Sequence, residues 1–124
     1  MRKFNEVARL PEFDRDLKRL LKKYRTLEDD LAMLVGAALF AFHKLKVDYH
    51  WIVRIYDLGA LRLPVYKVKH FACRSIKGAG SNTGLRLIYA YDEPADRIEL
   101  IEVYMKSERD VEDRERIRRH FLGL

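Results

Sequence analysis

The sequence predicts a single α+β domain over residues 1–124, in which an N-terminal strand and an αα-hairpin pack on an antiparallel β-meander followed by a short C-terminal helix. Two observations lead to this prediction. Apolar residues recur at helical spacing in the first third of the chain, and they alternate with polar residues in three stretches of the second half. A chain of 124 residues can also bury one core without disulfides or metals.

The N-terminal region is expected to contain a short strand within residues 2–9 and then a helix. Pro11 suits the first turn of that helix, because a residue there needs no backbone N–H. The apolar positions of the helix recur at helical spacing, and its opposite face is basic, which is typical of a solvated face. The expected apolar positions are Phe13, Leu17, Leu20, Leu21 and Tyr24.

A second helix is expected to begin after Thr26, which together with Asp29 resembles a capping box. The apolar run over residues 31–42 predicts burial on more than one side, so this helix should lie in the core. The run is too short to span a bilayer, which needs about 20 apolar residues.

The second half of the chain predicts three strands, over residues 65–72, 85–91 and 97–106. Before them, residues 43–63 form a connector with edge-strand character around Trp51, whose indole is interpreted as a packing group. In the strand VYKVKHFA, regular alternation places Lys67 and Lys69 on the same face. A terminal helix is expected over residues 110–121, with Asp110 as its N-cap.

Positive charge is concentrated in residues 58–91, which contain six Lys or Arg residues and no Asp or Glu. The other 19 basic residues are balanced by 19 acidic ones, so the net charge of +6 belongs to this stretch. Such a region predicts a surface that meets phosphate or an acidic partner. Its glycine-containing loop, residues 75–84, lacks the Gly-Lys-Ser/Thr of a nucleotide-binding loop, and its role stays open.

Cysteine and histidine are too few for a disulfide framework or a zinc site, since the chain has one cysteine, Cys73, and four scattered histidines. No metal or cofactor is therefore expected. The N-terminus lacks the apolar centre of a signal peptide. These features favour a cytoplasmic protein that does not associate with membranes.

Three segments, VYKVKHFACRSIKG, GLRLIYAY and RIELIEVYMK, followed by the charged DRERIRRHF, resemble the RelE/ParE superfamily of toxins from toxin–antitoxin systems. The resemblance covers about residues 11–121. It implies a RelE-like fold and a ribosome-dependent mRNA endonuclease that needs no metal, in which a 2′-hydroxyl attacks the adjacent phosphodiester. The implied partners are a cognate antitoxin, the ribosome and mRNA, and homo-oligomerisation is left open.

The resemblance also implies a set of site residues. Lys67 and Lys69 match the paired strand lysines of the family, Arg86 matches the arginine of its Gly-x-Arg strand, and Lys106 replaces an arginine that contacts phosphate. These four residues are the expected catalytic cations. Four further cations are expected to contact RNA: Arg74, Lys77, Arg114 and Arg118.

The C-terminal segment departs from the family pattern, because Glu112 stands where a Tyr or His commonly acts as acid or base. His120 lies near the helix end, and His70 is expected on the strand face opposite the two lysines, so a structural role is favoured for both. Alternative functions therefore stay open: a ParE-like gyrase inhibitor, an inactive toxin homologue, or a small basic nucleic-acid-binding module.

Overall fold

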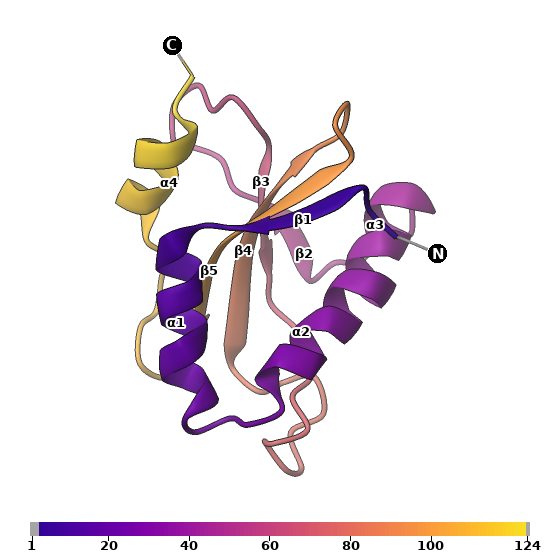
Figure 1. Cartoon of the computed structure of the whole chain (residues 1–124), viewed down its shortest axis with the longest axis vertical. Helices are drawn as coiled ribbons and strands as arrows, with labels where there is room; N and C mark the ends of the chain where they lie inside the picture. The colour runs from indigo at the N-terminus through magenta and orange to yellow at the C-terminus, as the bar shows by residue number, and fades with distance from the viewer. Residues whose placement is uncertain (1–2, 124) are drawn as a thin grey trace.

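The computed structural model describes residues 3–123 and shows an α+β architecture built on a mixed, five-stranded sheet (Figure 1). The π-helical turn Val35–Leu39 joins α2 to α3, so that residues 27–44 form one continuous helix. The elements are β1 (Glu6–Arg9), α1 (Pro11–Leu21), α2 (Leu27–Leu34), α3 (Phe40–Lys44), β2 (Ile52–Arg54), β3 (Val65–Val68), β4 (Leu85–Asp92), β5 (Arg97–Met105) and α4 (Arg114–Phe121).

The sheet has the strand order β1-β5-β4-β3-β2. The expected meander forms its centre, since β3, β4 and β5 pair antiparallel in sequence. Two short strands lie at the edges. β2 pairs antiparallel with β3, which confirms the edge strand expected near Trp51, while β1 pairs parallel with β5. The first strand is shorter than the expected residues 2–9, of which residue 2 lies outside the described part of the chain.

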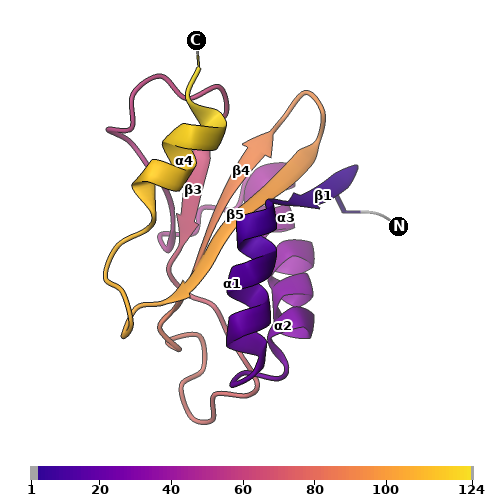
Figure 2. The ribbon, with the colours of Figure 1, turned by 60° about the vertical axis from the view of Figure 1, so that its left-hand side comes forward.

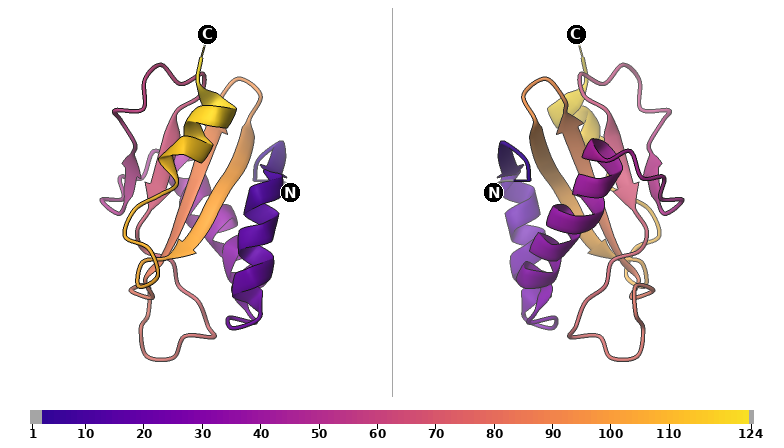
Figure 3. Two further views of the ribbon diagram at one scale, coloured as in Figure 1. Left: turned by 90° about the vertical axis from the view of Figure 1, so that its left-hand side faces the viewer. Right: turned by 90° about the vertical axis from the view of Figure 1, so that its right-hand side faces the viewer.

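The two N-terminal helical segments cover one face of the sheet, as the side views in Figure 3 show. Three of the expected core positions of α1, Phe13, Leu17 and Leu20, are buried there together with Tyr24, which confirms the helical pattern. Apolar burial of this kind contributes about 25 cal/mol per Å² and is the main force that holds the helices on the sheet. Within residues 3–123, every helix is too short or too polar to cross a bilayer.

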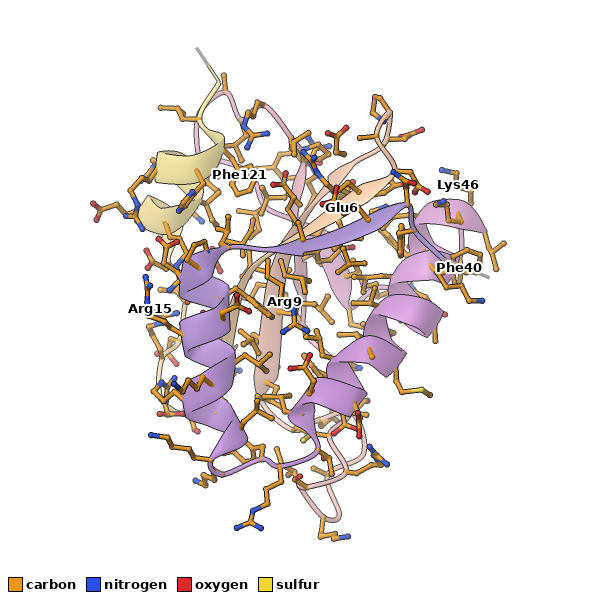
Figure 4. The ribbon with its side chains drawn as sticks, viewed as in Figure 1. Glu6, Arg9, Arg15, Phe40, Lys46 and Phe121 are labelled. Atoms are coloured by element: carbon orange, nitrogen blue, oxygen red, sulfur yellow. The ribbon has the colours of Figure 1, made fainter. Side chains whose placement is uncertain are left out.

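Arg9 links the two helical segments, because its side chain extends from β1 into the space between α1 and α2 (Figure 4). It forms ion pairs with Glu28 and Asp14, and its guanidinium lies 5.8 Å from the centre of the Phe13 ring. The helical hairpin is therefore held by ion pairs from the edge strand β1 as well as by apolar packing on the face of the sheet.

The expected capping box at the start of α2 is absent. The Thr26 side chain accepts no hydrogen bond from a backbone N–H of the first turn; its hydroxyl donates to the Asp30 side chain, at Oδ2, at 2.6 Å and lies 2.7 Å from Ser75 Oγ. The Ser75 N–H also donates to Thr26 Oγ1, at 3.0 Å. Thr26 thus anchors the glycine-containing loop to the helix, a contact between distant segments that no local pattern indicates.

The second face of the sheet is covered only in part, by α4 (Figure 2). Ile117 and Phe121 from this helix pack against Val65, Ile88 and Ile101 in a smaller apolar cluster. The glycine-containing loop projects from the end of the sheet opposite the C-terminus (Figure 2). On this second face, the end of the sheet near the loop is not covered by any helix of residues 3–123.

α4 begins at Arg114, so the expected start at Asp110 is wrong. Asp113 is the N-cap, and its side chain accepts a hydrogen bond from Arg116 N at 3.0 Å. Val111, which falls within the expected helix, lies before the observed one and is 50% exposed. The helix starts late because the preceding segment makes other contacts: Glu112 pairs with Lys67, and the Asp113 N–H donates to Glu102.

Candidate nucleic-acid interface

A basic pocket of about 340 Å³ lies where three strands meet at the open end of the sheet. β3 ends there, β4 begins there, and β5 ends beside them. The glycine-containing loop connects β3 to β4 at this end (Figure 2). The pocket is lined by Lys69, His70, Asn82, Gly84, Arg86 and Lys106.

The early end of β3 creates this pocket. Regular alternation to residue 72 would place Phe71 on the face of Lys67, but β3 ends at Val68, and Phe71 and Cys73 join Val68 in the helix-side core. Because alternating residues point to opposite faces, this change requires a break between residues 68 and 71. Lys69 and His70 occupy the break, and both line the pocket.

Arg86 is held by backbone carbonyl groups. Its Nη1 donates to the carbonyl oxygen of Lys69 at 2.8 Å and to that of Leu85 at 3.3 Å. The backbone of Lys106 is also fixed, because its N–H donates to the carbonyl oxygen of Gly84 at 2.8 Å. Carbonyl groups orient a guanidinium without neutralising it, so the full charge of Arg86 remains available.

The pocket carries uncompensated positive charge. Within residues 3–123, Lys69, Arg86 and Lys106 form no ion pair, and no acidic side chain lines the pocket. Three cations around one hollow produce a local positive potential that favours an anion such as phosphate. Nowhere in that part of the chain are three or more His, Cys, Asp or Glu side chains grouped to hold a metal ion.

Lys67 is separated from this pocket, although the sequence predicts that it acts beside Lys69. Its Nζ lies 3.0 Å from Glu112 Oε1, and the side chains are only 17% and 6% exposed. Burial opposes ionisation of both groups, yet the pKa of Glu112 is lowered and that of Lys67 is raised, because hydrogen bonds and the ion pair outweigh burial. The charge of Lys67 is therefore neutralised within the protein.

Two of the four expected RNA-contacting cations are likewise paired internally. Arg74 Nε lies 3.0 Å from Asp30 Oδ1, at the start of α2. Arg114 Nη1 lies 2.9 Å from Glu112 Oε2, and its Nη2 donates to two backbone carbonyl groups of the connector. The absence of acids from residues 58–91 is thus partly compensated in space by acids from other segments.

The other two expected RNA-contacting cations are exposed. Lys77 lies in the glycine-containing loop, and Arg118 lies on α4. Neither forms an ion pair in the part of the chain that the structure describes. Neither lines the basic pocket, so the structure does not bring them together with Arg86.

The two histidines discussed above have different surroundings. His120 Nε2 lies 3.1 Å from Glu12, and Arg119 and His120 together lower the pKa of Glu12 to about 2, so His120 links α4 to α1. His70 instead lines the pocket, and the expectation that it lies opposite Lys69 is wrong. One sequence signal could have placed His70 correctly. Val68 and Phe71 are both apolar but lie three positions apart, and in a regular strand such residues point to opposite faces.

No family model matches the chain, and neither the curated proteins nor the solved structures contain a match. The resemblance to the RelE/ParE superfamily therefore stays a prediction.

Proposed function

We propose that the protein is a RelE-like toxin that binds RNA through the basic pocket and cleaves mRNA on the ribosome. The observation that carries the proposal is the convergence of Lys69, Arg86 and Lys106, none of them paired with an acid, on one hollow that also contains His70. Phosphate groups are the anions that such a site suits best, since arginine and lysine are the usual phosphate-binding side chains.

The same residues fit cleavage by an internal hydroxyl. The 2′-oxygen attacks phosphorus, so that a 2′-O–P bond forms in a 2′,3′-cyclic phosphate while the P–O5′ bond breaks. His70 takes the 2′-hydroxyl proton, because imidazole is the commonest group for proton transfer near neutral pH. The departing 5′-oxygen takes a proton from water or from Lys106, and Arg86 stabilises the charge that develops on the phosphoryl oxygens.

The partners that this proposal requires are the ribosome with its mRNA and an antitoxin that covers the basic pocket. The ribosome supplies the unpaired substrate. An acidic or amphipathic segment of the antitoxin would complement the positive potential of the pocket. The cytoplasm is the compartment that fits these partners.

RNA binding without cleavage is the second candidate function, and one observation favours it. Lys67 is neutralised by Glu112, and the Tyr104 hydroxyl beside it is buried, so neither group reaches the pocket as a proton donor. A protein with three phosphate-binding cations and a single imidazole could bind RNA and block translation without breaking the chain. A ParE-like inhibitor of gyrase belongs to the same non-nucleolytic class.

Mapping mRNA 5′ ends after incubation with programmed ribosomes tests the proposal. The wild-type protein should produce cuts in phase with codons, and Arg86→Ala should reduce their rate by about 10²- to 10³-fold, as expected when a group that stabilises the transition state is removed. Lys18→Ala, which removes an exposed charge from the outer face of α1, should cleave at the wild-type rate. Binding of RNA without cuts would favour the second candidate, and DNA damage in cells that express the protein, without cuts in mRNA, would favour inhibition of gyrase.

A further inference from the structure

Three aromatic rings lie at the edge of the sheet beside the basic pocket. The indole of Trp51 and the imidazole of His70 are parallel within 2°, with ring centres 5.6 Å apart. The Tyr49 ring lies 4.6 Å from the indole, at an angle of 34°. Because His70 also lines the pocket, the rings extend from the outer edge of the sheet to the three cations.

The backbone fixes these rings relative to the pocket. Lys69 N donates to the carbonyl oxygen of Trp51 at 2.8 Å, and the next pair, Ile52 and Val68, belongs to the β2–β3 ladder. β2 is the last strand of the sheet, so no strand within residues 3–123 covers its outer edge. Backbone hydrogen bonds therefore position the stacked rings, and Trp51 and His70 stay only half-buried.

Core packing alone does not account for this arrangement. Tyr49 and Trp51 contact the helix-side core, but they stay half-buried, whereas Phe71 and Tyr89 of the same core are fully buried. The indole N–H of Trp51 and the ring nitrogens of His70 make no hydrogen bond within the described residues. Buried tryptophan usually finds a partner for this group, so free ring edges at an exposed site are typical of aromatic residues that contact a ligand.

We propose that Trp51 and His70 form a stacking platform for one unpaired nucleobase, whose neighbouring phosphate lies in the basic pocket. This inference rests on the proposed function and adds the form of the substrate. Stacking on an aromatic side chain strengthens binding about 5- to 100-fold for each base and tolerates any sequence, since every base has a π face. Bases in a duplex stack on one another, so the platform selects single-stranded RNA.

The platform also gives His70 a defined orientation. Its imidazole has one face against the indole, and this contact restricts rotation of the ring while both nitrogens stay free. Trp51 is thus a positioning residue for His70 as well as a surface for the base. Loss of the indole should weaken binding and, separately, slow the proton transfer assigned to His70.

Fluorescence offers a direct test, because Trp51 is the only tryptophan of the chain. The wild-type protein is titrated with a short single-stranded 2′-O-methyl RNA, which cannot be cleaved, with the same strand in a duplex, and with a strand that has abasic central positions. Indole emission reports stacking for unlabelled strands, and anisotropy reports binding for fluorescein-labelled ones. We expect the single strand to quench the emission and the abasic strand to bind about 5- to 100-fold more weakly without quenching.

Substitutions extend the test. Trp51→Leu should lose about 5- to 100-fold in affinity for the single strand and almost none for the abasic strand. Trp51→Phe keeps an aromatic face and should stay within a few-fold of the wild type. Tyr56→Leu is the matched control, because Tyr56 is 68% exposed and lies outside the platform. Thermal unfolding shows whether each variant is folded, and the abasic comparison uses only wild-type protein.

The outcomes separate the platform from the proposed function. Equal affinity for the single strand, the duplex and the abasic strand, with unchanged indole emission, overturns the platform. If Arg86→Ala still abolishes binding in that case, phosphate recognition by the pocket stands. Failure of the wild-type protein to bind any of these RNAs also overturns the platform, whereas the proposed function is decided by cleavage on programmed ribosomes.

Discussion

At the scale of single residues, Lys67 and Lys69 show how strongly surroundings decide what a cation can do. One residue separates them, yet Lys67 pairs with the buried Glu112, while Lys69 lines the pocket without an acidic partner. An ion pair that is largely buried costs several kcal/mol when one partner is removed, because the other charge stays desolvated. Lys67 therefore serves the fold, and Lys69 is the lysine available to a ligand.

His43 makes stability depend on pH. Its Nε2 lies 2.7 Å from the Tyr89 hydroxyl, and burial, with a smaller contribution from Lys46, lowers its pKa from 6.5 to about 4. Between these values the unfolded chain binds the proton that the folded protein excludes, so stability falls as the pH falls through this window. We expect this group to cost about 2 to 3 kcal/mol between pH 7 and pH 4.

Urea unfolding of the wild type and of His43→Gln at both pH values measures this effect. The variant should be less stable than the wild type at pH 7, because its side chain replaces a well-packed imidazole. It should then lose about 2 to 3 kcal/mol less on acidification. An identical loss in both proteins would show that another group controls the acid response.

At the scale of elements, the early end of β3 determines the shape of the candidate site. A strand that continued to residue 72 would direct His70 away from Lys69. The return of the chain into β4 depends on Gly84, whose φ is +88° and whose carbonyl oxygen accepts the hydrogen bond from Lys106 N. The pocket thus depends on one irregular strand end and one glycine.

Gly84→Ala should destabilise the protein and deform the pocket. An added Cβ would lie 2.9 Å from Met105 Sδ, in addition to the strain of a positive φ. Gly78→Ala is the matched control, because its φ is +78° but no atom lies within 4 Å of the added Cβ. We expect about 1 kcal/mol of destabilisation at Gly78, from backbone strain alone, and about 2 to 3 kcal/mol at Gly84. Equal losses in urea unfolding would contradict the role given to the Met105 contact.

At the scale of the whole molecule, the arrangement of charge matters more than its total. The net charge of +6 is assigned by the sequence to residues 58–91, but acids from α2 and from the segment before α4 approach two of the six cations. Of the other four, Lys69 and Arg86 line the pocket, where Lys106 joins them. The number of cations at the pocket predicts how RNA binding responds to salt.

Binding of a short 2′-O-methyl RNA should weaken with salt as expected for about three phosphate contacts. Each contact with single-stranded RNA contributes a slope of about −0.7 to log K against log [salt], so the wild type should show a slope of about −2. Arg86→Ala should reduce its magnitude by about 0.7, and Lys18→Ala should leave it unchanged. A wild-type slope near −4 would mean that Lys77 and other exposed cations contact RNA as well.

Local patterns predicted most elements of this fold. The helical spacing in α1 and the alternation in β4 and β5 each arise within one segment, so the sequence was sufficient to predict them. The boundaries that could not be predicted depend on distant partners. α4 starts later than expected because Glu112 contacts Lys67, which is 45 residues away in the chain.

The candidate site was predicted only in part. Lys69, Arg86 and Lys106, which are predicted as catalytic cations, line one pocket, but their roles stay predictions until cleavage is measured. His70 was assigned to the wrong face because regular alternation was assumed through residue 72. Lys67 was grouped with the site because no acidic residue lies near it in the sequence. Its partner, Glu112, is distant in the chain and comes close only in the folded protein.

The pairing of β1 with β5 has a consequence for synthesis of the protein. Glu6 pairs with Arg97, and Asn5 donates to Asp96 across a separation of 91 residues, so the edge of the sheet cannot form until late in translation. Contacts between such distant segments also slow folding. Lys106 follows β5 directly and is the last residue of the pocket to be made. A nascent chain therefore lacks a complete pocket until residue 106 has been added.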